Sequence, residues 1–336
     1  MERNYSRIIA YLSCMMILGA CGTSKKEDPQ ASVISYQNIP DPKRNLMTEE
    51  RVALGKMLFN DPILSGNGKI ACIDCHDQKY GYGENVALST NGITGEPLKR
   101  NSPPLINIAW ANGWFWEGGA KNIESLIFGP LTHPNEMGAN LKEMVNTLND
   151  HPEYPRLFQK AYQTKKIKSA YIARALAVYC RSLISNQSRY DQYLRGEINF
   201  SYDELKGMSL FQAKCGSCHP SPFFTDFNYH NIGLDNVFPD TLEGLYQGRG
   251  RITLEDNDMG KYKTPTLRNL FATAPYMHDG RLQTLEEVFD HYENGVKDYV
   301  SLAPQMRKGI STSEEEREMI LTFLKTLTDS TFLGLE

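Results

Sequence analysis

The fold of this chain is decided by Cys72-Ile73-Asp74-Cys75-His76 and by Cys215-Gly216-Ser217-Cys218-His219. Both stretches have the pattern Cys-x-x-Cys-His, which is the attachment signature of a c-type haem. In such a site two thiols bond covalently to the haem, and the neighbouring histidine ligates the iron from the proximal side. The repeated pattern predicts two covalently bound c-type haems, attached through Cys72, Cys75, Cys215 and Cys218, with His76 and His219 as proximal ligands.

Other uses of paired cysteines fit this sequence less well. The cysteine pairs of a structural zinc site lie about 15–20 residues apart, whereas these pairs lie at positions 72–75 and 215–218. A thioredoxin-like redox pair needs no adjacent histidine and belongs to a βαβ pattern that is missing here. Cys180 lies on the apolar face of a predicted helix, where a buried, inert thiol is the expectation.

The N-terminus has the pattern of an export signal. Arg3 and Arg7 precede a largely apolar run over residues 8–20, which is shorter than the roughly 20 residues needed to span a bilayer. The run ends in Leu-Gly-Ala-Cys21, which resembles a bacterial lipoprotein signal in which the cysteine is lipidated. We predict a signal over 1–20, a polar tether over 21–44 and a periplasmic protein anchored through Cys21. A plain signal peptide with an incidental cysteine is the alternative.

The composition is that of an ordinary globular protein. The 336 residues are 40% hydrophobic and 23% charged, and the formal net charge is −4. The absence of a basic surplus argues against a nucleic-acid partner. Contact with a membrane is predicted only through the lipid anchor at Cys21.

The sequence pattern predicts an all-α fold of two cytochrome c-like haem domains related by duplication. The motif Gly-x-x-Leu-Phe begins at Gly55 and again at Gly207, each time shortly before a haem block. Residues 168–184 have the apolar spacing of an amphipathic helix, and Ser313 with Glu316 forms a capping box ahead of another apolar stripe. Long segments rich in Gly, Asn, Asp and Pro are expected to wrap the haems as loops. The predicted domains are 45–197 and 198–336.

The residues between the two haem blocks favour peroxide chemistry over simple electron transport. A peroxide-using haem needs an open sixth coordination position and a nearby group that moves protons. No histidine lies between Gln78 and Thr132, while Trp116 and Glu136 are candidates for electron and proton transfer. Taken alone, Glu136 could be a solvated surface residue and Trp116 a core aromatic.

At this point the chain resembles the bacterial dihaem cytochrome c peroxidases and the related MauG-like enzymes. The resemblance extends over nearly all of residues 45–330. Besides the haem blocks, it rests on Arg100-Asn101-Ser102-Pro103, Phe115-Trp116-Glu117-Gly118, Gly129-Pro130 with Glu136-Met137, Thr264-Pro265-Thr266-Leu267-Arg268-Asn269, Thr273-Ala274-Pro275-Tyr276-Met277-His278-Asp279-Gly280 and Thr284-Leu285-Glu286.

The resemblance implies roles for individual residues. His76 would belong to the N-terminal, peroxidatic haem and His219 to the C-terminal, electron-transfer haem. Glu136 would be the distal acid–base that moves a proton from the inner to the outer peroxide oxygen. Trp116 would relay electrons between the haems.

The resemblance also implies a calcium ion between the two domains. Its ligands would be Asn101 and the backbone oxygens of Thr273 and Pro275. Asn101 could instead cap a turn.

Three positions depart from the pattern common in dihaem peroxidases. The distal histidine after the first haem block is missing, so we expect a peroxidatic haem that is open without reductive activation. Tyr292 stands where the peroxidases have a methionine ligand, and a tyrosine there is the MauG-like pattern. Tyr292 could also be a packing residue, with Met277 or His291 as the distal ligand of the second haem. Leu126 replaces a glutamine common in the family.

These observations leave three functions open. The first is a peroxidase that reduces hydrogen peroxide to water with electrons from a small periplasmic cytochrome or similar electron-donor protein. The second is a MauG-like oxidase that uses a two-haem high-valent state to modify a partner protein. The third is a dihaem electron carrier or redox sensor. A homodimer is expected by analogy alone.

Overall fold

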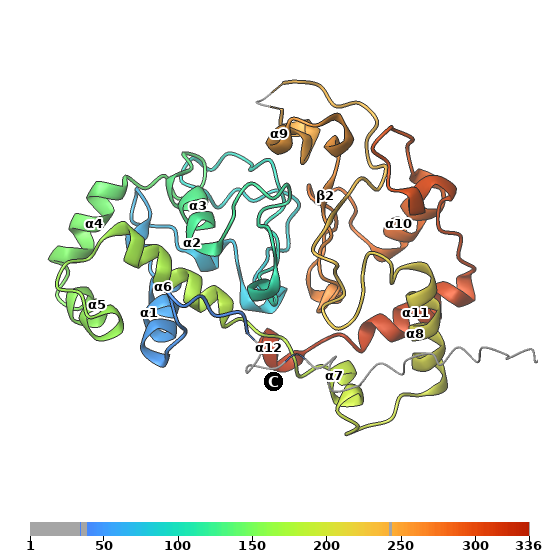
Figure 1. Ribbon diagram of the computed structural model, residues 1–336, viewed down its shortest axis with the longest axis horizontal. Helices are drawn as coiled ribbons and strands as arrows, with labels where there is room; N and C mark the ends of the chain where they lie inside the picture. The colour runs from blue at the N-terminus through green and yellow to red at the C-terminus, as the bar shows by residue number, and fades with distance from the viewer. Residues whose placement is uncertain (1–33, 35–38, 242–243, 336) are drawn as a thin grey trace, which may run out of the picture.

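The computed structural model describes residues 34, 39–241 and 244–335. The predicted signal, Cys21 and most of the tether lie outside the described residues. The chain forms two helical lobes that lie side by side (Figure 1). No helix of the described part is long and apolar enough to cross a membrane.

The helices of the described residues are short, and loops and 3₁₀ turns connect them. The first lobe contains α1 (Glu49–Asn60), α2 (Ile123–Leu126), α3 (Phe128–Thr132), α4 (Leu141–Asp150), α5 (Tyr154–Tyr162) and α6 (Ser169–Arg181). The rest of the chain adds α7 (Arg189–Leu194), α8 (Tyr202–Lys214), α9 (Gly250–Thr253), α10 (Leu285–Asp290), α11 (Glu314–Lys325) and α12 (Ser330–Leu333). A π-helical turn, η10 (His291–Gly295), continues α10.

The first lobe is built on the crossing of α1 and α6. The side chain of Thr48 caps α1, whose Leu58 is fully buried. The predicted apolar face over 168–184 is α6, and its buried residues include Cys180. A Cβ atom at Gly55 would lie 2.1 Å from the carbonyl oxygen of Ala175, so only glycine allows the two helices to approach this closely.

The second lobe repeats this arrangement with α8 and α11. Capping boxes at Ser201 and Ser313 begin the two helices, and the second of these was predicted from the sequence. A Cβ atom at Gly207 would lie 2.0 Å from the carbonyl oxygen of Met319. The glycine of each Gly-x-x-Leu-Phe motif therefore has the same task, namely close packing of the helix ahead of a haem block against the helix that ends the lobe.

The chain exchanges segments between the two lobes. Tyr190 of α7 packs in the core of the second lobe, whereas Phe332 and Leu333 of α12 pack in the core of the first. The carboxylate of Asp329, which caps α12, accepts a hydrogen bond from the hydroxyl of Ser185 at 2.9 Å. These contacts fasten the end of the chain across the junction of the lobes.

One small sheet interrupts the helical fold of the described residues. Strand β1 (Tyr229–His230) pairs antiparallel with β2 (Tyr262–Lys263), with Tyr229 opposite Lys263. These strands were not predicted from the sequence, because two residues are too few to create an alternating pattern.

Candidate active site

The two predicted proximal histidines are held in the same way. Nδ1 of His76 donates to the carbonyl oxygen of Tyr82 at 2.8 Å, and Nδ1 of His219 donates to that of Phe224 at 2.9 Å. A carbonyl can only accept, so Nε2 carries the lone pair in each ring. Burial lowers the pKa of both imidazoles, which favours the neutral form that ligates a metal.

The second haem block lines an apolar cavity inside the second lobe. Its walls include the attachment residues Cys215 and Cys218, His219, and the apolar face of α10. Burial raises the pKa of the Cys215 thiol to about 12. Both cysteines are free thiols rather than a disulfide, as haem attachment requires.

A lysine without an anionic partner makes this cavity a good fit for a haem. Lys263 is half-buried, and its Nζ donates to the carbonyl oxygen of Gly113 at 3.3 Å. In the described part of the chain no carboxylate lies within ion-pair distance of it, and desolvation lowers its pKa to about 8. A haem carries two propionate carboxylates, and one of them would supply the missing partner.

The three candidates for the distal ligand of the second haem lie in different places. Tyr292 and Met277 both line the cavity, whereas Nε2 of His291 contacts the carbonyl oxygen of Ile232 at 3.0 Å. Desolvation raises the pKa of the half-buried Tyr292 phenol, and the Cys215 and Cys218 thiols add to that shift. Tyr292 therefore lines the same cavity as both haem-attachment cysteines.

The first haem block lies close to Glu136. The charge of Glu136 acts on the Cys75 thiol, whose pKa is raised to about 11, chiefly by burial. Burial also raises the pKa of Glu136, and the charge of nearby His133 partly opposes this shift. A carboxyl group with a raised pKa beside a haem-attachment sulfur is suited to general acid–base work. Leu126, at the family's glutamine position, packs against the apolar core of this lobe.

Trp116 lies at the junction of the two lobes. Its side chain is 7% exposed and lines the cavity of the second lobe. The indole Nε1 donates to the carbonyl oxygen of Asn101 at 2.9 Å, and the backbone N–H of Lys263 donates to the Trp116 carbonyl at 2.7 Å. These bonds hold the ring in a fixed position between a loop of the first lobe and strand β2.

The predicted calcium ligands Asn101, Thr273 and Pro275 line the same cavity as Trp116. The Nδ2 of Asn101 donates to the carbonyl oxygen of Val86 at 2.9 Å, which leaves its Oδ1 as an acceptor. No group of three or more His, Cys, Asp or Glu side chains in the described residues could hold a metal. The calcium site therefore remains a prediction based on one amide and two backbone oxygens.

Two charged pairs near the cavity were not predicted from the sequence. His230 and Asp226 lie 2.8 Å apart, and this contact raises the pKa of His230 to about 9. Arg100 bonds Glu117 at 2.6 Å across a buried part of the first lobe. Neither spacing carries a signal of its own, because ordinary surface pairs occur at the same separations.

The fold and the site together define a dihaem protein of the c type, with a carboxyl group near one haem block and a tyrosine near the other. Comparison with known proteins agrees. The family described as di-haem cytochrome c peroxidase matches residues 49–199. The methylamine utilization protein MauG of Methylorubrum extorquens is 37% identical over 87% of this chain and 82% of that protein. Cytochrome c551 peroxidase of Nitrosomonas europaea is 31% identical over 82% of this chain and 79% of that protein.

The structural comparison gives the same result. The crystal structure of a MauG-like protein associated with microbial copper homeostasis matches with a TM-score of 0.81 and 32% identity, and it covers 90% of this chain and 96% of that one. The chain belongs to the di-haem cytochrome c peroxidase and MauG family. Membership implies two haems, as the two Cys-x-x-Cys-His blocks predict.

Proposed function

We propose that this protein reduces hydrogen peroxide to water with electrons from a small donor protein. The observation that carries the proposal is the position of Glu136, a carboxyl group with a raised pKa close to Cys75 of the first haem block. No histidine lies between Gln78 and Thr132 to close that haem. Relatives named cytochrome c peroxidase support this assignment.

The proposed reaction combines one peroxide with two electrons and two protons to give two waters. The haem at His76 supplies the iron chemistry when it is bound. Glu136 accepts the proton of the inner peroxide oxygen and returns it to the outer oxygen, so that water leaves as the O–O bond breaks. Trp116 provides a fixed aromatic ring for electron transfer from the second lobe.

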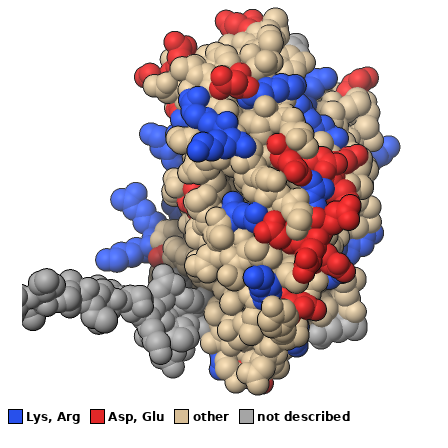
Figure 2. Space-filling model, turned by 90° about the vertical axis from the view of Figure 1, so that its right-hand side faces the viewer, with Lys and Arg blue, Asp and Glu red and all other residues tan. Residues whose placement is uncertain are grey.

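The surface of the second lobe suits a basic donor. Figure 2 faces the side of the molecule on which α10 lies and shows acidic side chains gathered there. The exposed residues of α10 include Glu286, Glu287 and Asp290, while its opposite face lines the haem cavity. An acidic surface this close to the cavity favours the docking of a positively charged electron donor.

A second function is favoured by Tyr292. Tyrosine at this position is the MauG-like pattern, and a relative named MauG is 37% identical to this chain, compared with 31% for one named cytochrome c551 peroxidase. A phenolate ligand stabilises oxidised iron, which suits an oxidase that acts on a partner protein. The alternative is therefore a MauG-like oxidase, and the dihaem electron carrier is the third candidate.

Further parts of the proposal concern the context of the enzyme. We propose haem domains over 45–197 and 198–336, with α7 packing against the second core. The repeated glycine contacts of Gly55 and Gly207 support an origin by duplication. We also propose export and a lipid anchor at Cys21, a calcium ion at Asn101, and a homodimer as the assembly.

Turnover of the haem-loaded protein tests the proposed function. Peroxide consumption is followed together with the oxidation of a reduced basic c-type cytochrome. The proposal expects two cytochromes oxidised per peroxide consumed. Peroxide consumption without donor oxidation would favour the oxidase, and no consumption at all would favour the electron carrier.

The distal ligand of the second haem can be tested by substitution. We expect Tyr292→Phe to change the ferric optical and paramagnetic resonance spectra of one haem only and to raise its midpoint potential, because a phenolate that stabilises ferric iron is lost. His291→Gln is the matched control, since His291 contacts a backbone carbonyl. If Met277→Leu changed the spectra and Tyr292→Phe did not, Met277 would be the ligand.

A further inference from the structure

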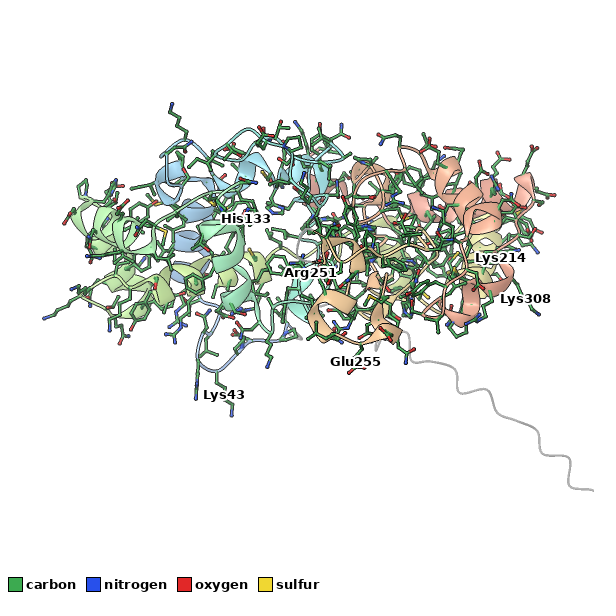
Figure 3. All side chains as sticks on the ribbon, turned by 90° about the horizontal axis from the view of Figure 1, so that it is seen from above. Lys43, His133, Lys214, Arg251, Glu255 and Lys308 are labelled. Carbon is green, nitrogen blue, oxygen red and sulfur yellow. The ribbon has the colours of Figure 1, made fainter. Side chains whose placement is uncertain are left out.

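His133 lies beside the proposed acid–base residue on its solvent side. It follows directly on α3, and its Nδ1 lies 3.6 Å from Oε1 of Glu136. Its side chain is 49% exposed, compared with 34% for Glu136. Figure 3 labels His133 next to the ribbon of the first lobe. Both side chains reach the surface, and the imidazole is the more exposed of the two.

The loop that carries both residues is firmly held. The backbone N–H groups of Glu136 and Gly138 both donate to the His133 carbonyl at 3.0 Å. The carbonyl of Glu136 accepts from the N–H of Ile93 at 2.7 Å. The N–H of Asn135 donates to Nδ1 of His133 at 3.2 Å. The ring thus has a defined position, and its neutral form keeps the proton on Nε2 with the Nδ1 lone pair toward Asn135.

We propose that His133 is a positioning residue that supplies solvent protons to Glu136. This inference rests on the proposed function. Glu136 moves one proton within the peroxide, but each turnover takes two more from water. An imidazolium at His133 gives its Nδ1 proton to the carboxylate and returns to the neutral form, whose lone pair the Asn135 N–H stabilises. Water then protonates the half-exposed ring again.

Few other groups act on Glu136. From its own loop the charged neighbour is His133. From the turn η4 (Cys72–Asp74) and its C-cap, Cys75 faces it, and that sulfur cannot titrate once it is bonded to haem. The segments packed against the loop contribute Gly66, Gly92 and Ile93, none of which is titratable. A change at His133 should therefore alter the pKa of Glu136 with little contribution from other charged groups.

The test compares His133→Gln with His151→Gln in the haem-loaded protein. His151 is a matched control, because its Nδ1 accepts the N–H of Glu153 at 3.2 Å in the same local arrangement, and among the described residues no carboxylate pairs with it. The rate of peroxide turnover with a reduced donor cytochrome, which includes the steps that take protons from water, is measured between about pH 4.5 and 8.

We expect His133→Gln to slow peroxide turnover about tenfold at the acidic end of the range, a smaller loss than removal of a group that touches the substrate would cause. The imidazolium lowers the pKa of Glu136, so its loss raises that pKa and moves the acid limb of the pH profile upward. Added imidazole should restore part of the rate, and His151→Gln should behave as wild type.

Three results would overturn the inference. A wild-type protein that does not react with peroxide would remove the proposed function and the inference together. A reactive wild type with an unchanged profile in His133→Gln would overturn the inference alone. A loss that is equal at every pH and is not rescued by imidazole would also overturn it, since a damaged loop behaves in that way.

Discussion

Replacing Glu136 with glutamine is expected to lower the rate of peroxide turnover by roughly 10²–10⁴-fold, the usual contribution of a general acid–base group. Glutamine has nearly the same shape but can neither accept nor return the proton of the peroxide. The residue is only one-third exposed, and burial raises the pKa of its carboxyl. Steady-state peroxide consumption by the haem-loaded variant measures the effect.

Glu143→Gln is the matched control for this substitution. Glu143 lies in the first turn of α4 and is exposed, so its loss should leave turnover unchanged. Haem content and the ferric spectra of Glu136→Gln should equal those of the wild type. Full activity in Glu136→Gln would remove the proposed acid–base role and favour an electron carrier.

Replacing Arg268 with methionine is expected to lower the free energy of unfolding by about 3–5 kcal/mol, the cost of leaving a buried charge without its partner. Arg268 and Asp191 form a two-bonded ion pair at 2.8 and 2.9 Å, and both side chains are fully buried. The Nε of Arg268 also donates to the carbonyl of Pro222 at 2.9 Å. The variant leaves the Asp191 carboxylate buried without its cationic partner. Urea unfolding of the haem-loaded protein measures the loss.

The double variant Arg268→Met with Asp191→Asn tests the physical reason. It removes the stranded charge, so it should be more stable than Arg268→Met alone. Arg195→Met is a suitable control, because its partner Glu197 is 52% exposed and such pairs contribute about 0–1 kcal/mol. An Arg268→Met variant as stable as Arg195→Met would show that α7 is not fastened by this pair.

Local patterns in the sequence predicted the parts of the fold that local forces determine. The two Cys-x-x-Cys-His blocks, the apolar face of α6 and the capping box at Ser313 are patterns of a few residues at fixed spacing. The haem-site prediction followed from the two Cys-x-x-Cys-His blocks. Family membership is confirmed, and the residues assigned through the resemblance remain predictions.

Contacts between distant segments could not be predicted in this way. Phe332 packs in the core of the first lobe, although nothing in its neighbourhood distinguishes it from residues of the second. Lys263 looks like a surface lysine in the sequence, but as a residue of β2 it is bonded to the Trp116 backbone and lines the cavity. His133 lies three residues before Glu136, and only the turn between them brings the two side chains together.

The central claim is that the first haem is open to peroxide, with Glu136 beside it, and that it needs no prior reduction. Mixing the fully oxidised, haem-loaded protein with one equivalent of hydrogen peroxide in a stopped-flow spectrophotometer tests this claim most directly. The account predicts a rapid optical change in the oxidised protein. No change until one haem has been reduced would contradict it, because a ligand would then close the iron and the enzyme would be a reductively activated peroxidase.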